Sequence, residues 1–230
     1  MHFRSPCHPQ PWSSTCCCSP AQDRHSTGRV LAFVALVCVS SLSNAAGWAS
    51  VQVFDSAQHP MPDAAVYAEP LSGQIGPKSV RRAEIEQRGR KFHPLVSVIQ
   101  AGTEVSFPNN DTVRHHVYSF SPAKNFELKL YAGVPATPVL FDKAGTVVLG
   151  CNIHDQMLAY IQVVNTPWLG KTDADGKVRL DNLPPGKYRL HAWHYRLPVA
   201  ATIPEKDITV ASGEVDAVFN LNVSPGAVVK

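Results

Sequence analysis

A cysteine, a histidine and a methionine stand three residues apart in the stretch GCNIHDQM, as Cys151, His154 and Met157. Thiolate, imidazole and thioether groups are soft ligands, which favour copper over hard cations. A copper site that transfers electrons combines one thiolate, two imidazoles and a weak axial donor such as a methionine. This short loop therefore supplies three of the four ligands of such a site.

Cys151 is unusual because it is the only cysteine in the sequence after residue 45. The chain has six cysteines, and those before residue 46 are Cys7, Cys16, Cys17, Cys18 and Cys38. Cysteines of exported proteins usually pair in even numbers as disulfides. A lone thiol in such a protein is either buried as a small hydrophobic residue or occupied by a ligand. The neighbouring histidine and methionine favour the second interpretation.

The remaining ligand is sought in the stretch VRHHV, where His115 and His116 are adjacent. Alternate residues of a strand share a face. His115 would share an apolar face with Val113 and Val117, which favours His115 as the inward ligand. His116 remains the alternative, on the opposite face of the strand.

The first 45 residues are typical of an export signal. Residues 24–29 are basic, residues 30–39 form an apolar core, and small residues at Ser43 and Ala45 suit signal peptidase. Ten apolar residues are fewer than the roughly 20 that span a membrane. We expect a cleaved signal, a periplasmic protein and no membrane span after cleavage, with an uncleaved anchor as the alternative.

The composition of the residues after 45 limits the partners and the folds that they allow. After residue 45 there are 18 Lys and Arg against 17 Asp and Glu, and no basic stripe with interleaved aromatic residues. Nucleic acid is therefore excluded as a partner.

Short alternating stretches recur every 8–12 residues between turn-forming residues, which predicts an all-β sandwich or barrel. The expected strands are two within 48–70, one within 71–92, and 95–100, 103–108, 113–120, 126–131, 139–142, 146–151, 157–164, 177–180, 188–194 and two within 208–223.

The stretches FPNNDTVRHHV and GCNIHDQM resemble those of type 1 blue copper proteins, the cupredoxins, over residues 83–165. The spacing of the ligand loop is that of the amicyanin group, and the wider chain is similar to exported methylamine utilization and plastocyanin-like proteins. The resemblance implies a Greek-key sandwich that holds one type 1 copper. Its implied ligands are His115, Cys151, His154 and Met157.

The same resemblance implies residues that support the ligands. Asn109 lies six residues before His115, as an asparagine does in the amicyanin group. Cupredoxins usually have an asparagine after the first ligand histidine, where this chain has His116. We expect His116 to reach the backbone of Asn152 and to tie the two loops together.

A second resemblance concerns the two ends of the chain. The stretches VQVFD, MPDAAVY and TDADGKVRLDNLPPGKYRL resemble the carboxypeptidase regulatory-like β-sandwich, a relative of starch-binding-like domains. This predicts that residues 49–75 and 166–223 form one discontinuous small sandwich, with the cupredoxin domain of residues 83–165 inserted. The alternative is two consecutive domains, in which 49–75 adds strands to the first.

Together these features predict a periplasmic carrier of single electrons. A catalyst needs an open coordination position, whereas four side chains would fill this site, so we expect no enzyme activity. The expected partner is a cytochrome c or a dehydrogenase that docks transiently near His154, on an apolar patch that includes Ile153 and Leu158. The alternative is a non-redox module that binds copper or carbohydrate, or that serves in adhesion.

Overall fold

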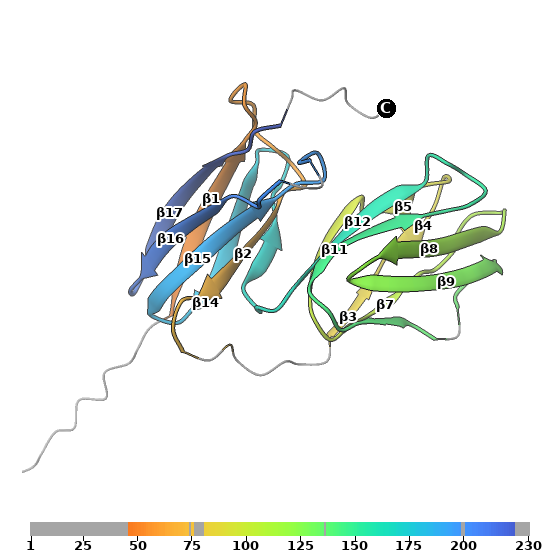
Figure 1. Cartoon of the computed structure of the whole chain (residues 1–230), viewed down its shortest axis with the longest axis horizontal. Helices are drawn as coiled ribbons and strands as arrows, with labels where there is room; N and C mark the ends of the chain where they lie inside the picture. Colours follow the sequence, from red (N-terminus) through yellow and green to blue (C-terminus); the bar gives the residue numbers. More distant parts are fainter. Residues whose placement is uncertain (1–45, 74, 76–80, 136, 199–200, 224–230) are drawn as a thin grey trace, which may run out of the picture. The chain divides into compact units, whose positions relative to one another are not determined.

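The computed structural model describes residues 46–73, 75, 81–135, 137–198 and 201–223. These residues form an all-β structure, as predicted (Figure 1). In the described part of the chain, no helix has the length and hydropathy needed to cross a membrane. The predicted export signal and its cleavage site in residues 1–45 lie outside the described residues.

Two sheets built from both ends of the chain form the first sandwich, called sandwich A. One sheet has the strand order β14-β1-β17 and the other β13-β2-β15-β16. The bounds of these strands are β1 (Gly47–Phe54), β2 (Ala65–Pro70), β13 (Leu169–Lys171), β14 (Lys177–Leu183), β15 (Gly186–Trp193), β16 (Glu205–Val210) and β17 (Glu214–Asn220).

The strand β1 lies between two strands from the far end of the sequence (Figure 1). Val51 pairs with Val178 of β14 in antiparallel register and with Ala217 of β17 in parallel register. Residues 51–54 of the N-terminal segment therefore pair with strands of the block 166–223. Alternate residues of β1 are buried, and they pack with residues of both sheets in one hydrophobic core.

The middle of the chain forms a second sandwich, called sandwich B. Its sheets have the orders β10-β7-β3 and β6-β12-β11-β8-β9, with a separate pair β4-β5. The bounds are β3 (Arg81–Glu84), β4 (Glu86–Gln87), β5 (Phe92–His93), β6 (Val96–Gln100), β7 (Thr103–Ser106), β8 (His115–Ser121), β9 (Lys124–Tyr131), β10 (Val139–Phe141), β11 (Gly145–Gly150) and β12 (Leu158–Val164).

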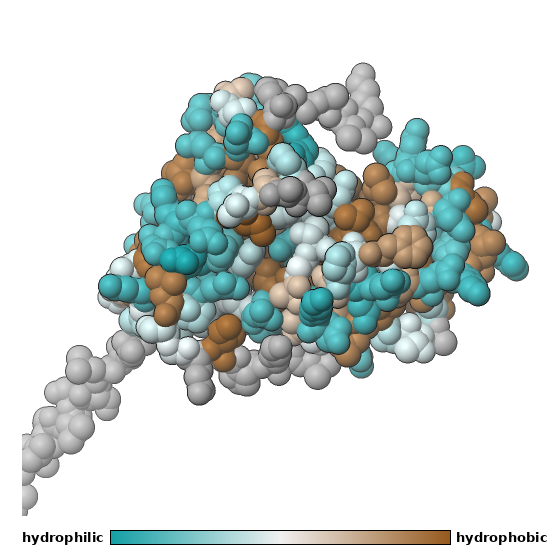
Figure 2. All heavy atoms as spheres, in the orientation of Figure 1, coloured by the Kyte–Doolittle hydropathy of each residue, from teal (hydrophilic) through white to brown (hydrophobic). Residues whose placement is uncertain are grey.

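The core of sandwich B collects apolar side chains from both of its larger sheets. Phe107 and Phe141 are among its largest fully buried members, and Cys151 and Met157 belong to the same cluster. On the face shown in Figure 2, polar and apolar residues are interspersed. The candidate ligands are thus attached to a packed apolar core, which fixes the strands that carry them.

Some predicted elements differ from the observed ones. The strand β13 was not predicted, and residues 71–92 contain three short strands in place of the single one expected. The predicted apolar face of Val113, His115 and Val117 is wrong for Val113, which is exposed in the turn before β8. The register of β8 against β9 shifts between His115 and Val117, so simple alternation does not hold at this end of the strand.

Candidate metal site

The candidate site lies where β8 and the β11–β12 connection meet. Cys151 directly follows β11, and the connection returns to β12, whose first residue Leu158 pairs with Gly150. The backbone N–H of Met157 donates to the carbonyl of His154 at 2.9 Å and closes a tight turn. β8 pairs with β11, which places His115, the first residue of β8, beside this loop.

Three potential ligand atoms converge at this point. Cys151 Sγ lies 4.0 Å from His115 Nδ1 and 4.0 Å from His154 Nδ1. The two imidazole rings meet edge to face with 5.0 Å between their centres. All three ligand atoms lie within 4.8 Å of one another, and in the described part of the chain no other group of histidine, cysteine and acidic residues does so.

These separations suit one shared metal ion. In protein sites, a metal such as zinc bonds sulfur at about 2.3 Å and nitrogen at about 2.0 Å, so two ligands can be up to roughly 4.3 Å apart. The observed separation of 4.0 Å between sulfur and each nitrogen lies inside this limit. Met157 is almost fully buried in the same cluster as Cys151. The soft donors Cys151 and Met157 favour copper among the possible ions.

Of the two adjacent histidines, His115 is the one that faces Cys151. It is fully buried, and its Nε2 donates to Asp111 Oδ2 at 2.7 Å. With the proton on Nε2, the lone pair of Nδ1 is directed toward the thiol group and available to a metal. A carboxylate that fixes the outer nitrogen of a ligand histidine is a common feature of metal sites. Asp111 was not predicted from the sequence, where its signal is its position four residues before His115.

Asp111 is itself held by a turn of the β4–β5 hairpin. The backbone N–H groups of Gly89 and Arg90 donate to its two carboxylate oxygens at 2.6 and 2.9 Å. Burial acts to raise the pKa of Asp111, but the hydrogen bonds from Arg90, His115 and Gly89 outweigh it and lower the pKa below 3.8. Asp111 is therefore a charged acceptor that joins this turn to His115.

Asn109, which the sequence analysis expected to support the ligands, anchors the loop before β8. Its Nδ2 donates to the carbonyls of Val113 and Tyr131 at 2.9 and 2.8 Å. Its Oδ1 accepts the backbone N–H of Asp111 at 3.0 Å. Asn109 thus fixes the backbone of the residue that orients His115.

His116 is directed to a different partner. Its Nε2 lies 2.8 Å from Glu127 Oε1 on β9, at ion-pair distance. Its ring centre lies 6.0 Å from that of Tyr118, two residues along the same strand. Asn152 is exposed, and the expected tie between His116 and the Asn152 backbone stays a prediction.

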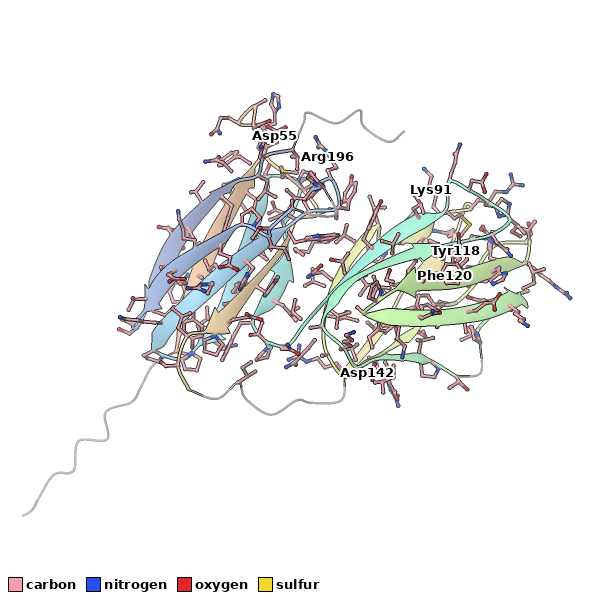
Figure 3. All side chains as sticks on the ribbon, in the orientation of Figure 1. Asp55, Lys91, Tyr118, Phe120, Asp142 and Arg196 are labelled. Atoms are coloured by element: carbon pink, nitrogen blue, oxygen red, sulfur yellow. The ribbon has the colours of Figure 1, made fainter. Side chains whose placement is uncertain are left out.

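An aromatic side chain lies against the residue before Cys151. A Cβ atom at Gly150 would be 2.8 Å from Cζ of Tyr118, so a larger residue there would require this ring to move. Tyr118 and Phe120 both come from β8 (Figure 3), and their ring centres are 5.1 Å apart. Phe120 is 76% exposed. This aromatic pair was not predicted from the sequence.

The fold and the site define an all-β protein with a candidate soft-metal centre in sandwich B. A family model described as polysaccharide lyase family 4, domain II, matches residues 164–218. Val164 is the last residue of β12 in sandwich B, and the strands in the rest of the match belong to sandwich A. No curated protein matches the chain.

Parts of the chain are similar to several solved structures. A Cu-containing nitrite reductase from Thermus scotoductus SA-01 matches with 23% identity and a TM-score of 0.35, over 42% of this chain and 25% of that chain. A purple cupredoxin from Nitrosopumilus maritimus matches with 21% identity and a TM-score of 0.32, over 36% and 99%. A pseudoazurin from Hyphomicrobium denitrificans matches with 23% identity and a TM-score of 0.32, over 36% and 74%. The chain thus spans a quarter of the nitrite reductase that it matches.

Proposed function

We propose that the protein binds one copper ion of the type 1 class and carries single electrons between redox proteins of the periplasm. The observation that supports this most is the convergence of Cys151 Sγ with His115 Nδ1 and His154 Nδ1, each at 4.0 Å. A thiolate with two imidazoles and a weak thioether is the donor set of electron-transfer copper sites. Copper held there would supply a one-electron couple.

Each residue of the site has a distinct part in this proposal. Cys151 supplies the thiolate from the core of sandwich B, and Met157 supplies the buried thioether. His115 is held in one orientation by the charged Asp111. A ligand set anchored in this way limits movement when the charge of the site changes, as an electron carrier requires.

The role of carrier, and not of catalyst, follows from the number of donors. Four side chains would fill the coordination positions, whereas metal catalysis needs one open to substrate. His154 is only half-buried, and its neighbours Ile153 and Leu158 are 48% and 45% exposed. A cytochrome c or dehydrogenase that docks over this apolar edge would come close to His154.

For the rest of the chain we propose the discontinuous arrangement. Residues 49–75 and 166–223 would form one carboxypeptidase regulatory-like domain, with the copper domain of residues 83–165 inserted. The pairing of β1 with β14 and β17 supports this division. The separate hydrophobic cores of sandwiches A and B support it as well.

The test is a titration of the protein with Cu(II), followed by cycles of reduction and oxidation. We expect one equivalent to give an intense visible band from thiolate-to-copper charge transfer, which Cys151→Ser abolishes. His115→Ala should lose the band, and His116→Ala should keep it with a changed spectrum. A colourless protein that binds zinc equally well would refute the proposal. A coloured protein that cannot be cycled would favour copper storage.

A further inference from the structure

A groove with a volume of about 610 Å³ lies beside His154. Its lining includes His154, Leu158 and two basic residues, Arg90 and Lys91. We propose that this groove is the docking surface for the acidic face of a redox protein, with Arg90 and Lys91 as its charged contacts. The inference rests on the proposed function and names the chemistry of the partner.

The two basic residues belong to the turn 88–91 between β4 and β5, called the basic turn. Three of its four residues are Arg88, Arg90 and Lys91, and all four are exposed. The backbones of Arg88 and Lys91 bond to each other at 3.0 and 3.3 Å, which closes the turn. Lys91, labelled in Figure 3, projects away from the ribbon. The turn therefore presents its positive charges outward.

Hydrogen bonds to Asp111 hold the basic turn in place. Gly89 and Arg90 have φ angles of 63° and 57°, and their N–H groups point at the Asp111 carboxylate. The same carboxylate holds His115. The backbone that carries the charged side chains consequently stands at a fixed place relative to the candidate metal site, which lowers the cost of ordering the turn when a partner binds.

The positive charge of the turn is only partly offset nearby, since Glu86 lies 3.8 Å from Arg88 and the Asp111 carboxylate accepts the backbone N–H groups of Gly89 and Arg90. The side chains of Arg90 and Lys91 form no ion pair with an acidic side chain among the described residues. Among the described residues that line the groove, Asp155 is the one that is acidic. Residues 46–230 carry nearly equal numbers of acidic and basic side chains, so the attraction of an acidic partner would come from the two basic side chains against one acidic side chain in the lining of the groove.

The groove also combines an apolar contact with a charged one, as a short-lived redox encounter needs. His154 is half-buried in its wall and Leu158 is 45% exposed, so an apolar contact lies next to the charged one. Carboxylates of a partner that pair with Arg90 and Lys91 would bring its redox centre over His154. Such encounters bury small areas, below roughly 1,200 Å², and depend on charge for their rate of association.

Docking is tested first on the copper-free protein, so that the result does not depend on copper chemistry. An acidic and a basic c-type cytochrome are each added at low ionic strength while backbone amide resonances are followed by NMR. The acidic cytochrome should shift residues 88–91 and 154–158, and added salt should reverse the shifts. Shifts that are confined to other surfaces, or that occur only with inorganic phosphate, would overturn the inference.

The charges are tested with paired variants of the copper-loaded protein. Arg90→Glu with Lys91→Glu should slow electron exchange with the acidic cytochrome about tenfold or more at low salt, within the range of electrostatic steering. The visible spectrum should not change, because the bonds from the turn to Asp111 use backbone atoms. Lys187→Glu is the control, as an exposed lysine on β15 of sandwich A.

The two proposals fail in different ways. If wild-type protein shows no thiolate-to-copper band, the proposed function fails. If the band is present but the Arg90→Glu, Lys91→Glu variant exchanges electrons as fast as the Lys187→Glu control, only the docking inference fails.

Discussion

Replacement of Asp111 by asparagine tests how the candidate ligand His115 is held. The carboxylate accepts three hydrogen bonds, from Gly89 N at 2.6 Å, Arg90 N at 2.9 Å and His115 Nε2 at 2.7 Å. The amide of asparagine has the same shape, but one of its two ends can only donate. At least one of the three donors must therefore lose its acceptor.

The size of the effect follows from these bonds. A hydrogen bond to a charged group contributes about 1.5–3 kcal/mol, and an exposed one less. The Asp111 side chain is 14% exposed, so we expect the free energy of unfolding to fall by about 1–2 kcal/mol. Loss of a carboxylate that orients a ligand histidine typically weakens metal binding by about 10- to 100-fold.

Two measurements check this expectation. Urea unfolding of the metal-free protein gives the change in stability, and competition with a chromophoric chelator gives the change in copper affinity. Asp155→Asn is the matched control, because it removes the same charge next to His154 and no described residue bonds to that carboxylate. Equal losses in the two variants would show that charge alone matters and would refute the orienting role of Asp111.

Three further predictions concern packing, pH and the backbone. Gly150→Ala should lower the free energy of unfolding by about 1–2 kcal/mol, because the added methyl group would collide with Tyr118. In urea unfolding, Gly150→Ala should have no such cost when it is made in the Tyr118→Ala variant. The pKa of His194 is lowered from 6.5 to about 4, first by burial and then by the charge of Arg196. As the pH falls, the unfolded chain therefore binds a proton at His194 before the folded chain does. The stability present above pH 6.5 should fall as the pH drops toward 4, by at most about 2 kcal/mol between pH 7 and pH 5. His194→Gln should not show that fall, and equal pH dependence of the two proteins would contradict the assignment. Gly176→Ala should cost more than about 2 kcal/mol, because φ is +73° and its Cβ would lie 2.5 Å from the Val53 carbonyl oxygen; unfolding at an unchanged urea concentration would count against this.

Much of the β structure could be predicted because strand residues alternate between core and solvent. The pattern of β1, with every second residue buried, is visible in the sequence as alternating apolar and polar residues from Ala49 to Val53. The strands β4, β5 and β13 have only two or three residues. Too few residues alternate in these three strands for a periodicity to show, whereas β10, which also has three residues, was predicted as 139–142.

In the candidate site, too, residues that are close in sequence could be predicted, whereas contacts between distant segments could not. Cys151, His154 and Met157 could be recognised because their spacing lies within one loop of the sequence. The bond of Asp111 to His115 spans only four residues, but the support that Asp111 receives from the turn 88–91 could not be predicted, since that turn is distant in sequence and donates through backbone atoms. The register shift between His115 and Val117 likewise has no local signal. Contacts of this kind arise only once the chain has folded.

The central claim is that Cys151, His115 and His154 hold one copper ion together. X-ray absorption at the copper edge reports the elements bound directly to the metal. We expect one sulfur at short distance and two imidazole nitrogens in the copper-loaded protein, and loss of the short sulfur in Cys151→Ser. A spectrum with only nitrogen and oxygen neighbours in the unsubstituted protein would contradict the claim.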